Sequence, residues 1–250
     1  MLSGVGDKEH LDEVGIKTVL HSPEVGRNLQ DHLIVGINFD TRDATSADLL
    51  AGSYPSTWTS YMEGKGPLTS PNLDGVGQIR SEVNKDTRGR PDVQFHLVAL
   101  TGATDYGIQL RYNIGMDDDL MAWNVKHAVN YSSMIMPTLN RPKSRGFIKL
   151  RTRDPQDHPI IQPNYLTVQH DVDTLVAGIM RGLDLLDTEV MAEAGTIVWE
   201  EPLPHCQHLE FRSRAYWECY VRSVAATVYH HVGTCAMGTV LDNKYDNDVT

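Results

Sequence analysis

The 250-residue sequence is poor in basic residues and has no long apolar run. It carries 22 Lys and Arg against 33 Asp and Glu, a formal net charge of -11 at pH 7. A nucleic-acid-binding surface needs clustered Lys and Arg to meet the phosphates, so this composition argues against nucleic acid as a partner. A membrane-spanning helix needs roughly 18 consecutive apolar residues. No stretch of the sequence approaches that length, so no membrane span is expected.

Cysteine is also scarce. Cys206, Cys219 and Cys235 are the three in the chain, and an odd, sparse set does not define a disulfide framework. One pair could form a bridge if the parent protein is secreted. The sequence leaves open which pair that would be, and it leaves the localisation open as well.

The glycine-rich turn of dinucleotide-binding folds is absent. Such a turn reads G-x-G-x-x-G between a strand and a helix, and it binds a pyrophosphate. Gly4-Val5-Gly6 has the first two glycines, but it is followed by Asp7-Lys8-Glu9 and lacks the third. We interpret it as a simple turn. The 250 residues would suffice for one large domain or two smaller ones, and the 40% apolar content is typical of a globular protein.

Residues that alternate between apolar and polar predict half-buried strands. They occupy residues 93–98, 132–136 and 146–150, and 34–39 also has the composition of a strand. The segment 139–144 resembles a turn, so we expect the two strands on either side of it to pair antiparallel. Because no regular alternation of strand and helix occurs, the sheet should be mainly antiparallel.

Three helices are predicted. Asp7 can cap a short helix over residues 8–14, and another helix should begin near Ser213. A third should run over 171–186, because six apolar residues fall on one helical face. They are Val172, Leu175, Val176, Ile179, Leu183 and Leu186. The predicted fold class is therefore α+β, a mainly antiparallel sheet with long helices.

Two clusters resemble metal sites in composition only. His205, Cys206, His208 and Cys219 could imitate a zinc site, but their spacing fits no standard pattern and the neighbouring prolines indicate a surface loop. Asp117–Asp119 lacks the glycine and the final glutamate of a calcium loop, and a solvated turn is the better interpretation. We therefore expect no metal site.

The run from Tyr229 to Gly238 is the most informative segment. It holds His230 and His231, then Gly233, Thr234 and Cys235. Histidine exchanges a proton near neutrality and is the commonest general base, so the run is typical of a tight turn that presents an imidazole. The alternative is a buried, hydrogen-bonded histidine pair between a strand and a helix.

The run resembles the catalytic segment of the glucose–methanol–choline (GMC) oxidoreductases, which are FAD-dependent alcohol dehydrogenases and oxidases. That family carries the pattern aromatic-His-x-Val-Gly-Thr-x-x-Met. Further blocks match in order, nearest to the glucose-dehydrogenase-like branch. They are Ser3–Gly6, Val25–His32, Pro142–Gly146 and Pro163–Leu166 followed by Asp171.

The resemblance implies a division into domains. Residues 1–33 and 226–250 would be fragments of an FAD-binding domain, and 34–225 would be a substrate-binding domain. It also implies a partial chain, without the N-terminal FAD-binding turn and the extreme C-terminus of the family. Asp31 and His32 could form an orienting pair, but their place near the domain boundary favours a structural use.

The resemblance also implies residue roles. His230 matches the general base that takes the alcohol proton while a hydride passes to flavin N5. Tyr229 matches the aromatic residue that lines the substrate pocket, and Val232, Gly233 and Thr234 would contact the flavin. The substrate would be a small alcohol or sugar, with oxygen or another electron acceptor left open. The alternative is a non-catalytic fragment that binds a ligand or a partner without flavin.

Overall fold

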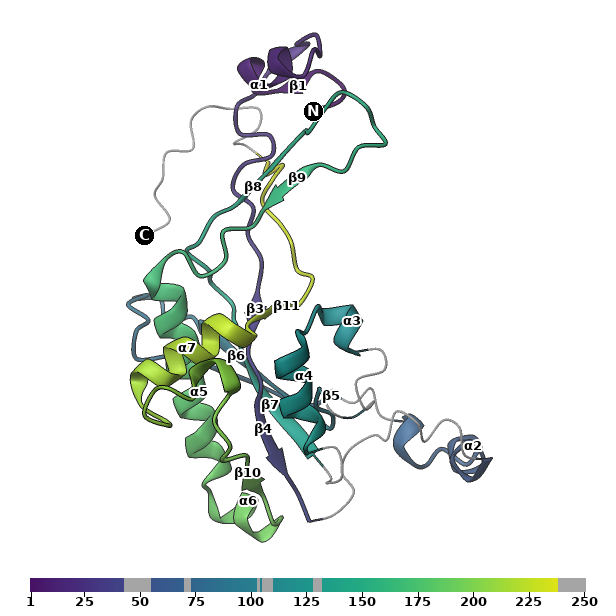
Figure 1. Ribbon diagram of the computed structural model, residues 1–250, viewed down its shortest axis with the longest axis vertical. Helices are drawn as coiled ribbons and strands as arrows, with labels where there is room; N and C mark the ends of the chain where they lie inside the picture. The colour runs from purple at the N-terminus through teal and green to yellow at the C-terminus, as the bar shows by residue number, and fades with distance from the viewer. Residues whose placement is uncertain (43–54, 70–72, 103, 105–109, 128–131, 238–250) are drawn as a thin grey trace. The chain divides into compact units, whose positions relative to one another are not determined.

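The computed structural model describes residues 1–42, 55–69, 73–102, 104, 110–127 and 132–237 (Figure 1). The chain forms two compact units. Unit 1 comprises Met1–His32, Pro142–Asp171 and Thr227–Thr250, and unit 2 comprises Leu33–Arg141 and Val172–Ala226. Each unit is therefore assembled from segments that lie far apart in the sequence.

Unit 2 is built on a seven-stranded sheet. Its strands follow the order β10-β4-β7-β3-β11, and β6 pairs with both β7 and β5. Their bounds are β3 (Leu33–Ile34), β4 (Ile37–Asp40), β5 (Leu73–Ile79), β6 (Val93–Val98), β7 (Ser132–Leu139), β10 (Ile197–Val198) and β11 (Ala226–Thr227). The pairings of β7 with β3, β4 and β6 are all antiparallel, as are β5 with β6 and β10 with β4. The predicted fold class is confirmed.

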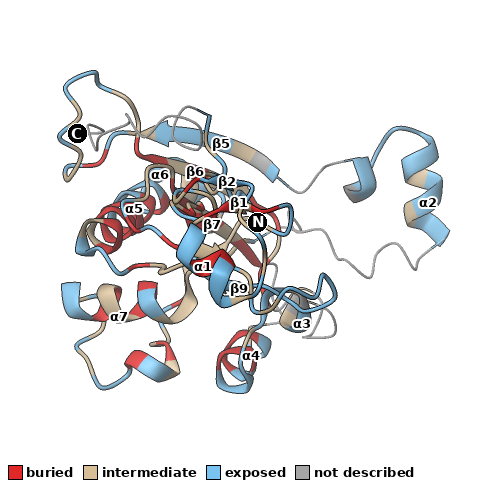
Figure 2. Cartoon of the chain, turned by 90° about the horizontal axis from the view of Figure 1, so that it is seen from above, coloured by how far each residue is buried: buried red, intermediate tan, exposed pale blue. Residues whose placement is uncertain are grey.

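Helix α5 (Gln169–Leu186) covers this sheet. All six apolar residues of the predicted stripe are buried, and Figure 2 shows buried residues in red along α5. Two glycines let the helix approach closely, since a Cβ on Gly178 would lie 2.8 Å from Pro137 and one on Gly182 would lie 2.6 Å from Ile37. The helix was predicted because its stripe has the 3.6-residue period of a buried face.

Helix α7 (Arg214–Val224) begins where the sequence predicts, at a cap formed by Ser213, whose Oγ accepts from the Tyr216 amide at 3.1 Å. Its Tyr220 hydroxyl donates to the Gly36 carbonyl at 2.6 Å, and burial raises the pKa of this tyrosine. A disulfide between Cys206 and Cys219 joins α7 to η3 (Pro204–Cys206). This decides the pairing that the sequence left open.

The remaining helices of unit 2 are short. They are α2 (Pro55–Met62), η2 (Pro67–Thr69), α3 (Leu110–Ile114), α4 (Asp118–Val125) and α6 (Glu189–Glu193). Asp117–Asp119 are exposed, as the prediction of a solvated turn requires, but they cap and begin a helix and do not form a turn. Asp117 caps α4 by accepting from the Leu120 amide at 2.8 Å, and the two acidic residues that follow suit the positive end of a helix.

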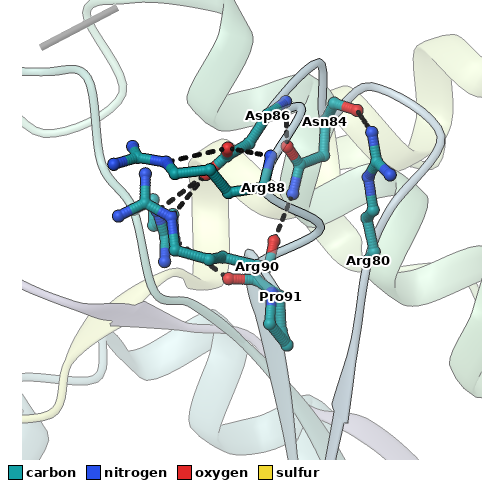
Figure 3. A network of polar contacts seen from close by, with 7 residues as sticks. Arg80, Asn84, Asp86, Arg88, Arg90 and Pro91 are labelled. Atoms are coloured by element: carbon teal, nitrogen blue, oxygen red, sulfur yellow. Dashed lines mark hydrogen bonds and ion pairs between the residues drawn. The ribbon is translucent and has the colours of Figure 1, made fainter.

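A polar network closes the loop between β5 and β6 (Figure 3). Asp86 accepts from Arg90 at 2.6 Å and from Arg141 at 3.3 Å, and it also contacts Arg88. The Asn84 amide donates to the Arg90 carbonyl at 2.9 Å. These contacts replace the backbone pairing that a short hairpin turn would provide, so we interpret the network as structural.

The described part of unit 1 contains two small sheets. Strands β1 (Val5–Gly6) and β2 (Leu20–His21) are parallel, and β8 (Phe147–Lys149) and β9 (Ile160–Gln162) are antiparallel. Helix α1 (Lys8–Glu13) begins at Asp7, whose carboxylate accepts from the Glu9 amide as predicted. Buried His10 of this helix accepts from the Leu150 amide at 3.1 Å through Nε2.

Two strand predictions need correction. The expected pairing of 132–136 with 146–150 is wrong, because β7 pairs with β3, β4 and β6 while β8 pairs with β9. The expected single strand 34–39 is divided into β3 and β4 around Val35 and Gly36. Among the described residues, no helix is both long and apolar enough to cross a bilayer.

Candidate active site around Asp31 and His230

Two segments of unit 1 form the site. Residues 227–234, called the His230 segment below, run antiparallel to residues 26–32. Gln30 and Val232 exchange two backbone hydrogen bonds of 2.9 Å, and the Gly26 amide donates to the Thr234 carbonyl at the same distance. The pairing places a histidine pair beside Asp31 and His32, although about 200 residues of sequence separate them.

Asp31 lies at the centre of the site, and its side chain is 0% exposed. Its Oδ1 accepts from the His230 amide at 3.0 Å. Its Oδ2 accepts from the Tyr165 hydroxyl at 2.6 Å and from the Thr227 hydroxyl, and His231 Nε2 lies 3.2 Å away. A buried carboxylate is tolerated only when it is hydrogen-bonded, and these donors meet that requirement.

The Tyr165 hydroxyl is held as a donor. Burial raises its pKa to about 12, and the hydrogen bond to Asp31 acts in the same direction. The phenol therefore keeps its proton over the ordinary pH range. It also lies 3.4 Å from His231 Nε2, so Tyr165 connects the carboxylate with the second histidine of the pair.

The two histidine rings contact different partners. His230 Nδ1 lies 3.1 Å from His32 Nδ1, with the rings edge to face at 5.3 Å between centroids. His231 instead approaches Asp31 and Tyr165 through Nε2. Since a neutral imidazole carries one N–H, one of the two facing Nδ1 atoms of His32 and His230 must donate and the other accept. His230 Nε2 is then the nitrogen that remains for a substrate.

The backbone of the segment is strained at Tyr229. This residue has φ of 61° and its side chain is 67% exposed. A left-handed conformation is costly for a bulky aromatic residue and clusters at functional sites. The Tyr229 amide donates to the Thr227 hydroxyl at 2.9 Å, so Thr227 links the strained turn to Asp31.

Gly233 is required by the packing of the chain itself. Its φ is 99°, and a Cβ at this position would lie 2.2 Å from the Asn28 carbonyl oxygen. Around it, Val232 is 60% exposed, and Met237 is exposed as well. Val232 of the segment and Met237 just after it thus present apolar side chains to the solvent.

Sequence reasoning named His230, Tyr229, Val232, Gly233 and Thr234, and the structure places all five on this one segment. It missed Tyr165 and Thr227, and it assigned Asp31 no more than an orienting or structural part. The residues around Asp31 gave no local signal of its burial, because its neighbours Gln30 and His32 are polar. Once buried, a carboxylate must find donors. Which donors it finds depends on the tertiary pairing.

The cluster around His205 does not form a metal site. Cys206 and Cys219 are joined to each other, and a disulfide sulfur is not a thiolate ligand. Over the described ranges, no three His, Cys, Asp or Glu side chains are grouped so that they could hold a metal ion.

Comparison with known proteins gives consistent matches. Residues 142–246 match the family model described as GMC oxidoreductase. The chain is 33% identical over 242 residues to "Glucose dehydrogenase [FAD, quinone]" of Drosophila melanogaster, covering 95% of this chain and 36% of that protein. It is 34% identical over 244 residues to "Alcohol dehydrogenase [acceptor]" of Pseudomonas putida, covering 95% and 39%.

A solved structure agrees in fold. Formate oxidase of Aspergillus oryzae RIB40 superposes with a TM-score of 0.70 at 23% identity, covering 93% of this chain and 41% of that one. The chain thus spans less than half the length of each of these three proteins. At this identity the structural similarity supports the fold alone.

Proposed function

Because the chain belongs to the GMC oxidoreductase family, we propose that the protein containing it oxidises a small alcohol or sugar at a CH–OH group. FAD is the proposed cofactor, and when bound it would supply the acceptor for the hydride. The observation that carries the proposal is the His230 segment, where an exposed imidazole is held in place by buried Asp31 and by His32.

His230 is the proposed general base. A base must come within about 3 Å of the substrate hydroxyl to take its proton. The contact with His32 occupies Nδ1 of His230, so Nε2 is the atom that would receive the proton. Loss of that proton raises the electron density on the alcohol oxygen and so favours departure of the hydride from the adjacent carbon.

The neighbouring residues fit one wall of a site for a flat ring. Val232 is exposed, and Gly233 and Thr234 are partly exposed, so apolar surface and a hydroxyl lie along one extended backbone. We propose that these three residues contact the flavin and that Tyr229 lines the substrate pocket. Since the chain contains no G-x-G-x-x-G turn, the proposal covers the ring of the cofactor and not its pyrophosphate.

The division into FAD-binding and substrate-binding parts stays a prediction. Residues 1–33 and 226–250 were assigned to the former and 34–225 to the latter. The compact units of the structure group residues 142–171 with the two terminal segments. We propose that 142–171 supports the His230 segment, because its Tyr165 donates to Asp31.

The base assignment is tested by paired alanine substitutions in the full-length, flavin-loaded protein that contains this chain. His230→Ala should lower turnover by roughly two to four orders of magnitude, the usual contribution of general base catalysis. His231→Ala is the matched control and should cost much less. Flavin absorbance should be the same in both variants. Equal losses, or a larger loss for His231→Ala, would contradict the assignment.

A second candidate is a ligand-binding chain that holds no flavin. The missing glycine-rich turn favours it, since that turn supplies most contacts to a pyrophosphate. The flavin content of the protein that contains this chain discriminates between the two candidates, because only the first candidate predicts bound flavin there. Stoichiometric flavin absorbance after desalting would rule out the flavin-free candidate.

A further inference from the structure

We infer that Asp31 and His32 are positioning residues for His230, with Asp31 fixing its backbone and His32 fixing its ring. The two are adjacent in sequence, and each contacts a different part of the same histidine. The inference rests on the proposed function only for the role of His230 as base. The claim that Asp31 and His32 hold His230 in place rests on the contacts alone.

Asp31 closes the strained turn from both sides. Thr227 donates its hydroxyl to Oδ2, and His230 donates its amide to Oδ1. These two residues flank Val228 and Tyr229, the second of which has the left-handed φ of 61°. One buried carboxylate thus bonds the chain before and after the strained residue, and strain of this kind persists only where the surroundings over-determine it.

The contact with His32 couples the proton positions of the two rings. The two Nδ1 atoms are 3.1 Å apart, so a single proton lies between them when both rings are neutral. If His230 carries this proton, its Nε2 holds the lone pair that a base requires. In serine protease triads a carboxylate, which can only accept, fixes the tautomer of the catalytic histidine, and His32 would have the same effect when its Nδ1 is the acceptor.

The titratable groups around this site belong to several segments of unit 1. Asp31 and His32 come from the 26–32 segment, Tyr165 from the segment after β9, and His231 from the His230 segment. His231 Nε2 is already within contact distance of Asp31 and Tyr165. Because these contacts occupy His231, we assign it a supporting part, whereas Asp31 and His32 position His230 for catalysis.

The tautomer is measured by NMR on the ¹⁵N-labelled 250-residue chain under alkaline conditions, with His230→Gln used to assign the ring. Long-range ¹H–¹⁵N correlations should show His230 in the Nδ1–H form. His32→Leu should shift it toward the Nε2–H form, whereas His32→Asn, which can place an acceptor oxygen near the Nδ1 position, should restore the original pattern. A native His230 in the Nε2–H form, or one unaffected by His32→Leu, overturns the role of His32.

The backbone role is measured by amide hydrogen exchange. Asp31→Asn leaves one acceptor oxygen, so either Oδ1 or Oδ2 loses its donors. Exchange at Tyr229 and His230 should accelerate about tenfold or more, the factor expected for one hydrogen bond to a charged acceptor. The control is Asp171→Asn, since Asp171 is equally buried and accepts from the Lys143 and Ser144 amides. Equal acceleration in both variants overturns the inference.

A milder variant covers the case in which Asp31→Asn does not fold. Thr227→Val keeps the shape but removes the hydroxyl that bridges Tyr229 and Asp31. It should accelerate exchange at the same two amides, and unchanged exchange there overturns the inference. The NMR and exchange results need no flavin. If His230→Ala retained turnover while they came out as expected, the proposed base would be wrong and the positioning contacts would stand.

Discussion

Gly233→Ala should destabilise the chain strongly because two costs act together. A left-handed conformation costs an ordinary residue roughly 1–2 kcal/mol, and φ at Gly233 is 99°. The added Cβ would also lie 2.2 Å from the Asn28 carbonyl oxygen. This is a backbone atom, so relief requires a shift of one segment, and forced packing typically costs about 1–3 kcal/mol. We expect a loss of about 2–5 kcal/mol from both sources.

Gly15→Ala is the matched control. Gly15 belongs to the same unit and has φ of 73°, but a Cβ there would meet nothing within 4 Å. It should therefore show the conformational cost alone, roughly 1–2 kcal/mol. Urea denaturation followed by circular dichroism gives both free energies of unfolding. If Gly233→Ala costs no more than Gly15→Ala, the close approach of Gly233 to Asn28 is not present in the folded chain.

Three further predictions follow from the structure. Cys219→Ser opens the disulfide to Cys206 and should lower the free energy of unfolding by about 2–4 kcal/mol. Cys235→Ser, at an exposed free cysteine, is the control and should leave the melting temperature unchanged. Equal effects of the two substitutions would contradict the pairing. Tyr165 has its pKa raised to about 12, so the stability that it contributes is complete below about pH 10 and is lost as pH rises through about 12. A Tyr165→Phe variant should lack a tyrosinate absorbance transition near pH 12, and an unchanged alkaline titration would refute the shift. Without a G-x-G-x-x-G turn, the purified 250-residue chain should show no flavin absorbance, and a yellow product would disprove this.

Local signals in the sequence were sufficient for the periodic elements. Strand β6 occupies the predicted residues 93–98, and α5 buries the predicted stripe. Both have a period set by their own backbone geometry and a face that must leave water. The cap at Asp7 and the start of a helix near Ser213 were predicted for a similar reason, because a capping side chain bonds an amide two or three residues away.

Strand partners were not predictable from local pattern. The 132–136 and 146–150 segments both form strands as predicted, but they pair with different partners. A turn-like linker of the right length made antiparallel pairing of neighbours plausible. The alternation of apolar and polar residues shows which face of a strand is buried, but not which other strand pairs with it. Long-range contacts therefore decided the pairing.

By itself the sequence determined the fold class, the helical and strand faces, and the segment that holds His230. The family pattern in that segment is local, so residue types and spacing were enough to recognise it. Only the tertiary structure decided that Asp31 is buried beneath the His230 segment, that Tyr165 and Thr227 donate to it, and that the rings of His230 and His231 contact different partners. The physical reason is that a buried charge takes its donors from wherever the folded chain brings them, here from residues more than 130 positions away.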